Sequence, residues 1–118
     1  MAWHFENGRP IYTQLLEQIE QKIISGEYSA GQKLPSVREL AMEAAVNPNT
    51  MQRAMAELEQ RGLVVTNRTA GRTVTENQQI LADIKEERDL ECTRVYVTQM
   101  KEMGFEKKEI VALIEKGE

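Results

Sequence analysis

The chain has 118 residues, of which 41% are hydrophobic and 29% are charged, so it is long enough for one small domain with a short appendage. No apolar run approaches the ~18 residues of a membrane span, and the start lacks the pattern of a signal peptide. The single cysteine cannot form an internal disulfide, and one cysteine with one histidine argues against a zinc site built from Cys and His. The net charge of −4 argues against a broadly basic protein. The segment from Lys33 to Arg72, however, contains six Lys or Arg residues and only four glutamates, so it is locally positive. We expect a cytoplasmic protein without membrane partner, metal or cofactor, with a locally positive middle segment.

A first helix is predicted from about Ile11 to Ser25. Pro10 suits the opening of a helix, because its missing N–H costs nothing there, and Gly26 suits the end. Apolar side chains recur at spacing four, which is typical of a helix that covers a core with one face. They are Ile11, Leu15, Ile19 and Ile23.

A second, short helix is predicted to begin after Ser36 and to stop near Ala45. Ser36 and Glu39 have the spacing of a capping box, in which each side chain accepts a hydrogen bond from a backbone N–H at the start of the helix. The preceding stretch, Glu27–Lys33, is rich in turn-forming residues. The inward face of the helix consists of Val37, Leu40, Ala41 and Ala44.

A third helix should begin directly after a tight turn at Ala45 and Val46. Asn47 is a good N-cap, Pro48 suits the first helical position, and Gly62 suits the C-terminal end. Two helices joined by so short a turn are the helix-turn-helix arrangement. The apolar face of the third helix consists of Met51, Ala54, Met55 and Leu58.

The rest of the chain is predicted to form a hairpin and two further helices. Leu63–Thr66 and Arg72–Thr75 are β-prone segments around a turn, which predicts a two-stranded wing. From about Glu76 the pattern is helical as far as Gly104, and a last helix is expected over Glu106–Lys116.

Together these elements predict an α+β fold that is mostly helical, with a winged helix-turn-helix over residues 1–75 and a short two-helix C-terminal tail for dimerisation over residues 76–118. The tail has more apolar side chains than so short a segment can bury alone. The simplest way to bury them is contact with a second subunit. The residues in question are Val95, Met100, Ile110, Leu113 and Ile114. Cys92, in the same tail, is interpreted as a packing residue, and a redox-sensing role stays open.

The outer face of the third helix has the residue types of a DNA-reading surface. No carboxylate occurs between Asn47 and Ala56, as expected of a helix that enters a major groove between two rows of phosphates. Arg can pair with guanine, and Asn or Gln with adenine. Thr50, in the first turn, is placed for a phosphate. The side chains opposite the apolar face are Asn49, Arg53, Ala56 and Gln60, with Gln52 at the shoulder.

Further candidate contacts flank this helix. Arg38, on the exposed side of the second helix, could bind a phosphate or reach a base, whereas Ser36 is either a DNA contact or only a helix cap. At the wing, Arg68 and Arg72 offer charge to a minor groove, and Gly71 permits a close backbone approach. The alternative for the wing is a solvated hairpin with a turn glycine. Two more cations are interpreted as solvated, Lys33 and Arg61.

Over roughly residues 9–75 the sequence resembles the GntR family of bacterial regulators. Leu34–Ala41 is similar to the family's signature at the second helix, and Val46–Ala54 resembles its turn and recognition helix. There are departures: Ala45 stands where many members have glycine, and Pro48 where others have a base-reading arginine. The resemblance implies DNA contacts from Ser36, Arg38, Asn49, Thr50, Gln52, Arg53 and Gly71.

The length of the tail resembles the YtrA-like subfamily, whose members dimerise through it and often control neighbouring transporter genes. We therefore expect a homodimeric regulator, with the role of a repressor, on double-stranded operator DNA. The operator should be an inverted repeat, because two recognition helices related by a two-fold axis meet successive major grooves about 34–36 Å apart.

The sequence also bears on two other classes of function. A winged-helix module that binds protein and not DNA is the alternative, and the acidic net charge favours it. An enzyme is disfavoured, because the sequence contains no phosphate-cradling glycine-rich loop and no constellation of catalytic residues. No residues identify a site for a small-molecule effector, so that partner stays open.

Overall fold

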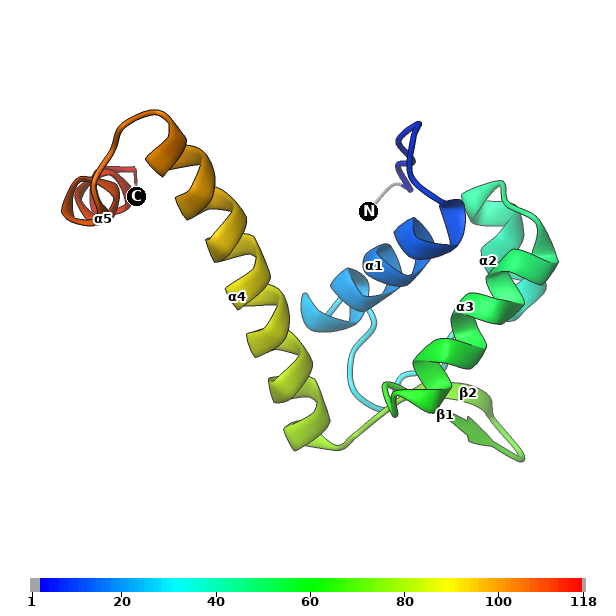
Figure 1. Cartoon of the computed structure of the whole chain (residues 1–118). Helices are drawn as coiled ribbons and strands as arrows, with labels where there is room; N and C mark the ends of the chain where they lie inside the picture. The colour runs from blue at the N-terminus through cyan, green and yellow to red at the C-terminus, as the bar shows by residue number, and fades with distance from the viewer. Residues whose placement is uncertain (1–2, 118) are drawn as a thin grey trace. The chain divides into compact units, whose positions relative to one another are not determined.

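The computed structural model describes residues 3–117, which divide into two compact units, one ending at Ala82 and the other beginning at Asp83 (Figure 1). This confirms a winged helix-turn-helix followed by a helical tail. No helix among these residues combines the length and hydropathy needed to cross a bilayer. The elements are α1 (Ile11–Ile24), α2 (Val37–Ala44), α3 (Pro48–Gln60), β1 (Val64–Asn67), β2 (Gly71–Val74), α4 (Gln78–Glu102) and α5 (Lys107–Lys116).

The starts of α2 and α3 are set by the predicted local signals. The Ser36 hydroxyl accepts a hydrogen bond from the Glu39 N–H at 3.1 Å, and the Glu39 carboxylate accepts one from the Ser36 N–H at 3.1 Å. The side-chain oxygen of Asn47 accepts from the Asn49 N–H at 2.7 Å, and Pro48 is the first residue of α3. The capping box and the proline start are both confirmed.

The turn between α2 and α3 depends on Ala45. This residue has φ of 56° and ψ of 47°, in the left-handed region, and it is the one non-glycine residue with positive φ in the described part of the chain. The turn lets the Val46 N–H donate to the Ala41 carbonyl at 3.0 Å. A side chain with a Cβ pays about 1–2 kcal/mol for this conformation, so the tight turn is held against local strain.

α1 and α2 both pack against α3, and this three-helix core supports the outer face of α3 (Figure 1). An ion pair adds a polar tie between α1 and the end of α3, because Arg61 Nη1 lies 2.6 Å from Oε1 of the nearly buried Glu20. Arg61, which was interpreted as solvated, is exposed and also makes this ion pair. The buried apolar residues of this unit are Leu15, Leu16, Ile19, Ile23, Leu34, Leu40, Ala41, Ala44, Met51, Ala54, Met55, Leu58, Leu63, Val64 and Val74.

The wing is an antiparallel hairpin in which Val64 pairs with Val74 and Asn67 with Gly71. Its strands lie within a residue of the predicted positions. The other edge of β2 is also paired: the Leu34 N–H donates to the Arg72 carbonyl at 2.9 Å, with a bridge between Lys33 and Thr73. The end of the stretch predicted as a turn-rich loop is thus strand-like, which anchors the wing to the chain just before α2.

The segment before α1 is bound by side chains of that helix. The Gln14 amide donates to the carbonyls of Glu6 (3.0 Å) and Arg9 (2.9 Å), and its oxygen accepts from the Glu6 N–H at 2.7 Å. One turn later, Gln18 exchanges the same pair of hydrogen bonds with the backbone of His4. The two amides therefore hold residues 4–9 along α1.

The division between the units falls inside α4, whereas the sequence placed the boundary between residues 75 and 76. The Asn77 side chain caps α4 by accepting from the N–H groups of Gln79 and Ile80 at 3.0 and 3.2 Å. Ile80 in the first turn lies directly against Gly62. The beginning of α4 thus belongs to the first unit, and the second unit starts only at Asp83.

In the second unit, Gly104 with φ of 94° separates α4 from α5, as predicted. Ile110 is buried, whereas Val95, Leu113 and Ile114 are exposed. Cys92 is exposed as well, so its interpretation as a packed apolar residue is wrong for the single chain.

Candidate nucleic-acid interface

The outer face of α3 is open to solvent along its first half. Asn49, Gln52 and Arg53 are exposed, and Thr50 is half-buried in the first turn. The opposite face is buried in the core. The stretch of α3 without carboxylates is therefore also exposed to solvent. A major groove is wide enough to admit one helix with such a face.

Arg53 does not project straight into solvent. Its guanidinium carbon lies 4.5 Å from the centroid of the Tyr12 ring, at the start of α1. This distance is within the ~6 Å of a cation–π contact. The side chain thus bends toward the α1 side of α3 while it stays exposed.

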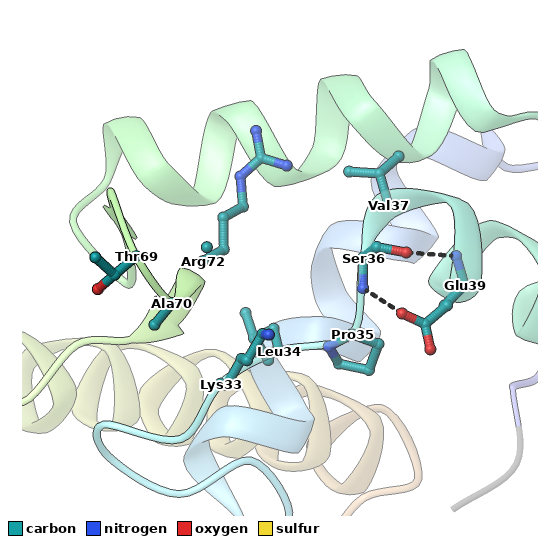
Figure 2. Close-up of a pocket in the computed structure, with 10 residues that line it drawn as sticks. Lys33, Leu34, Pro35, Ser36, Val37, Glu39, Thr69, Ala70 and Arg72 are labelled. Carbon is teal, nitrogen blue, oxygen red and sulfur yellow. Dashed lines mark hydrogen bonds between the residues drawn. The ribbon is translucent and has the colours of Figure 1, made fainter.

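Between the wing and the start of α2 lies a cleft of about 380 Å³ (Figure 2). The capping box of Ser36 and Glu39 forms part of its wall. The N–H and hydroxyl groups of Ser36 hold the pKa of the Glu39 carboxyl below its usual value of 4.5. The Ser36 hydroxyl is therefore already engaged within the capping box, where it also accepts from the Glu39 N–H. The lining residues are Lys33, Leu34, Pro35, Ser36, Val37, Glu39, Thr69, Ala70, Gly71 and Arg72.

Arg72, on the far wall of the cleft, reaches toward α3 (Figure 2). Its Nε lies 3.5 Å from a carboxylate oxygen of Glu59, and the side chain is only 23% exposed. The same carboxylate accepts a hydrogen bond from the Thr66 hydroxyl on β1. Glu59 therefore connects both strands of the wing to α3, through a hydrogen bond from Thr66 and an ion pair with Arg72.

The wing tip is ordered by Asn67. Its side-chain oxygen accepts from the N–H groups of Thr69 (3.0 Å) and Ala70 (3.3 Å) and from the Thr69 hydroxyl (2.9 Å). Gly71 has φ of 80°, a conformation that L side chains rarely adopt, and a Cβ there would meet no atom within 4 Å. The glycine is therefore required by its backbone and leaves room for a close ligand. Arg68 is exposed at the tip.

Arg38 is exposed on α2, beside the turn that leads to α3. It lines a shallow, mostly apolar hollow of about 590 Å³ together with Met42 and Pro48. Arg38 thus lies on the same side of the turn as the start of α3.

Three residues that contact arginines near this surface were not predicted as site residues from the sequence: Tyr12, Glu20 and Glu59. Each binds an arginine that the sequence had singled out, namely Arg53, Arg61 and Arg72. Glu59 could have been identified from the sequence, because a negative charge is unexpected near the end of a helix that is predicted to bind DNA. The other two lie on α1, and nothing local to them points to α3.

Residues 11–74 match the family described as "Bacterial regulatory proteins, gntR family". The HTH-type transcriptional regulator YhcF of Bacillus subtilis (strain 168) is 40% identical over 107 residues, which cover 91% of this chain and 88% of that protein. The HTH-type transcriptional repressor YtrA of the same strain is 44% identical over 71 residues, 60% of this chain and 55% of its own length. A GntR family transcriptional regulator from Listeria monocytogenes superimposes with a TM-score of 0.86 and 38% identity, covering 95% of this chain and 98% of that one.

Proposed function

Since the chain belongs to the GntR family of bacterial DNA-binding transcriptional regulators, close to YhcF and YtrA, we propose that it acts as a homodimeric repressor on an inverted-repeat operator. The observation that carries the proposal is the outer face of α3, which is exposed and free of carboxylates over its first half. A protein with this role works on the chromosome in the bacterial cytoplasm, and membership in this family separates it from the enzymes.

In this proposal α3 lies in the major groove. Asn49, Gln52 and Arg53 read base edges, and Thr50 binds a phosphate at the helix start. Pro48 occupies a position from which other members read a base, so this chain reads one position fewer there. What supports these roles is exposure, residue type and the absence of competing negative charge.

The flanking contacts come from α2 and the wing. We assign a phosphate contact to Arg38 and another to Ser36, both of which are exposed at the start of α2. Gly71 and Arg68 approach the minor groove from the wing tip. Arg72 contributes its remaining N–H groups, because only its Nε faces Glu59. In the bound state the cleft between wing and α2 faces the DNA backbone that separates the two grooves.

The second unit is proposed to hold two subunits together. Val95 is 55% exposed, and Leu113, Ile114 and the half-buried Met100 add to the apolar surface. Exposed apolar side chains in this number indicate a partner surface, and an identical subunit fits the proposed inverted-repeat operator. Ile110 is already buried in the single chain, so its part in dimerisation is to support the surface from beneath.

The repressor role rests on the similarity to YtrA, which is named a repressor. The association of its subfamily with neighbouring transporter genes makes such genes the first targets to test. Any inverted repeat upstream of the chain's own gene is the natural operator candidate.

The test is binding to that upstream region, measured by fluorescence anisotropy over a series of salt concentrations. Arg38→Ala should weaken binding to all sequences alike and reduce the salt slope by about one, as expected for the loss of one phosphate contact. Arg53→Ala should instead reduce the preference for the operator over a scrambled duplex, by about 1–3 kcal/mol. Lys85→Ala, which removes one exposed charge from α4, is the control.

Unchanged affinity and preference in the Arg38→Ala, Arg53→Ala double variant would show that these residues do not form the interface. Negligible affinity even at low salt, where phosphate binding is strongest, would instead favour a winged helix that binds protein.

A further inference from the structure

We propose that Tyr12 is a positioning residue for DNA recognition, whose ring holds the guanidinium of Arg53 in the pose from which its N–H groups meet the DNA. The inference rests on the proposed DNA contact of Arg53. It adds α1 to the recognition machinery, although α1 carries none of the base-reading or phosphate-binding residues assigned above. The contact that carries it is the 4.5 Å distance between the Arg53 guanidinium carbon and the centroid of the Tyr12 ring.

The chemistry of the two groups allows stacking and DNA binding at once. A guanidinium is planar, and it donates its hydrogen bonds in that plane, while an aromatic ring covers it from one face. The ring therefore leaves the fork of N–H donors free for a base edge or a phosphate. A carboxylate partner would occupy those donors, as Glu20 does with a guanidinium N–H of Arg61. Arg53 is instead held by an aromatic ring.

Tyr12 is fixed well enough to serve as a platform. It lies in the first turn of α1 and is half-buried. Two residues later, Gln14 is buried and bound to the backbone before the helix, and Leu15 is fully buried in the core against α3. A long arginine side chain loses rotamer freedom when it binds DNA. A ring that restricts it beforehand lowers this cost and aims the fork.

The test compares Tyr12→Leu with Tyr12→Phe in operator binding. Leucine keeps an apolar side chain but loses the π face, whereas phenylalanine keeps the face and loses only the hydroxyl. We expect Tyr12→Leu to weaken operator binding about two- to five-fold and to reduce the preference over a scrambled duplex, with Tyr12→Phe close to the native protein. In the Arg53→Ala background, Tyr12→Leu should have no further effect, because the group it positions is gone.

The outcomes separate this inference from the proposed function. Additive losses in the double variant, stronger binding by Tyr12→Leu, or an unchanged preference in that variant would each overturn the positioning role while Arg53 keeps its place in the interface. If Arg53→Ala leaves operator binding intact, the role of Arg53 fails, and the inference with it. Should Tyr12→Leu fail to fold, phenylalanine with three ring fluorines at position 12 weakens the π face at nearly constant shape and must reproduce the loss relative to Tyr12→Phe.

Discussion

The two units of the chain bury their apolar side chains very differently. Up to Ala82, residues from α1, α2, α3 and the wing form a closed core in which Leu15, Met51 and Leu58 are fully buried. From Asp83 on, Ile110 is the one buried apolar residue described, and α4 leaves Leu90 and Val95 about half exposed. A unit with a core of its own can fold alone, whereas two helices without one depend on what covers their exposed apolar side chains. The contrast predicts that changes in the first unit act on folding and changes in the second on assembly.

The largest effect should come from the core of the first unit. Leu58→Ala removes a fully buried side chain between α3 and its neighbours, and we expect the free energy of unfolding to fall by about 2–5 kcal/mol. Urea unfolding followed by circular dichroism measures this. Leu90→Ala is the matched control, because the same truncation on α4 removes a side chain that is 49% exposed. Equal losses from the two variants would contradict the contrast between the units.

The sequence was sufficient where the deciding chemistry is local. Ser36 with Glu39, Asn47 with Pro48, and the apolar spacing on α3 are all contained in short windows, and each placed its element correctly. What it missed depends on partners far along the chain. The pairing of Leu34 with Arg72 turns a predicted loop into a third strand-like segment.

The same limit applies to the interface. The sequence identified the exposed polar face of α3 but could not show which arginines are already engaged. Arg72 forms an ion pair with Glu59, and Arg53 lies over the ring of Tyr12. In both cases the partner lies on another element, and the periodicity of one helix carries no information about it.

The next effect tests the second unit as an assembly surface. Val95→Glu places a charge on the exposed apolar surface of α4, and we expect the dimer dissociation constant to rise about ten-fold or more, because a charge buried at an interface is costly. Sedimentation velocity over a range of concentrations measures it. Met42→Glu is the control, since Met42 is 75% exposed but lies in the first unit.

Operator binding should follow assembly in these variants. Val95→Glu should lose affinity for the full inverted repeat while its affinity for a half-site is unchanged, because the recognition helix itself is intact. A native chain that sediments as a monomer at all concentrations, or a dimer unaffected by Val95→Glu and also by Leu113→Glu, would remove the second unit from this role.

A smaller effect of opposite sign is expected at the turn of the helix-turn-helix. Ala45→Gly should stabilise the first unit by about 1 kcal/mol, because glycine adopts the left-handed conformation of this residue without the steric cost of a Cβ. Urea unfolding checks the sign. Ala56→Gly on the exposed side of α3 is the control, and there we expect a loss of about 1 kcal/mol. Destabilisation by both changes would mean that position 45 carries no strain.

The smallest effect concerns the capping box at the start of α2. The hydrogen bonds from Ser36 lower the pKa of Glu39, so the folded state favours the ionised carboxylate. A carboxyl with a lowered pKa stabilises the fold above its ordinary value of 4.5, and this contribution is lost as the pH falls through the folded-state pKa. Glu39→Gln keeps a capping side chain without a titrating group. Between about pH 6 and about pH 3 the native protein should therefore lose more of its unfolding free energy than Glu39→Gln does. Glu43→Gln, which removes the same charge from α2 outside the capping box, should follow the native curve, and a Glu39→Gln curve that falls as steeply as both would show that the cap does not depend on ionisation.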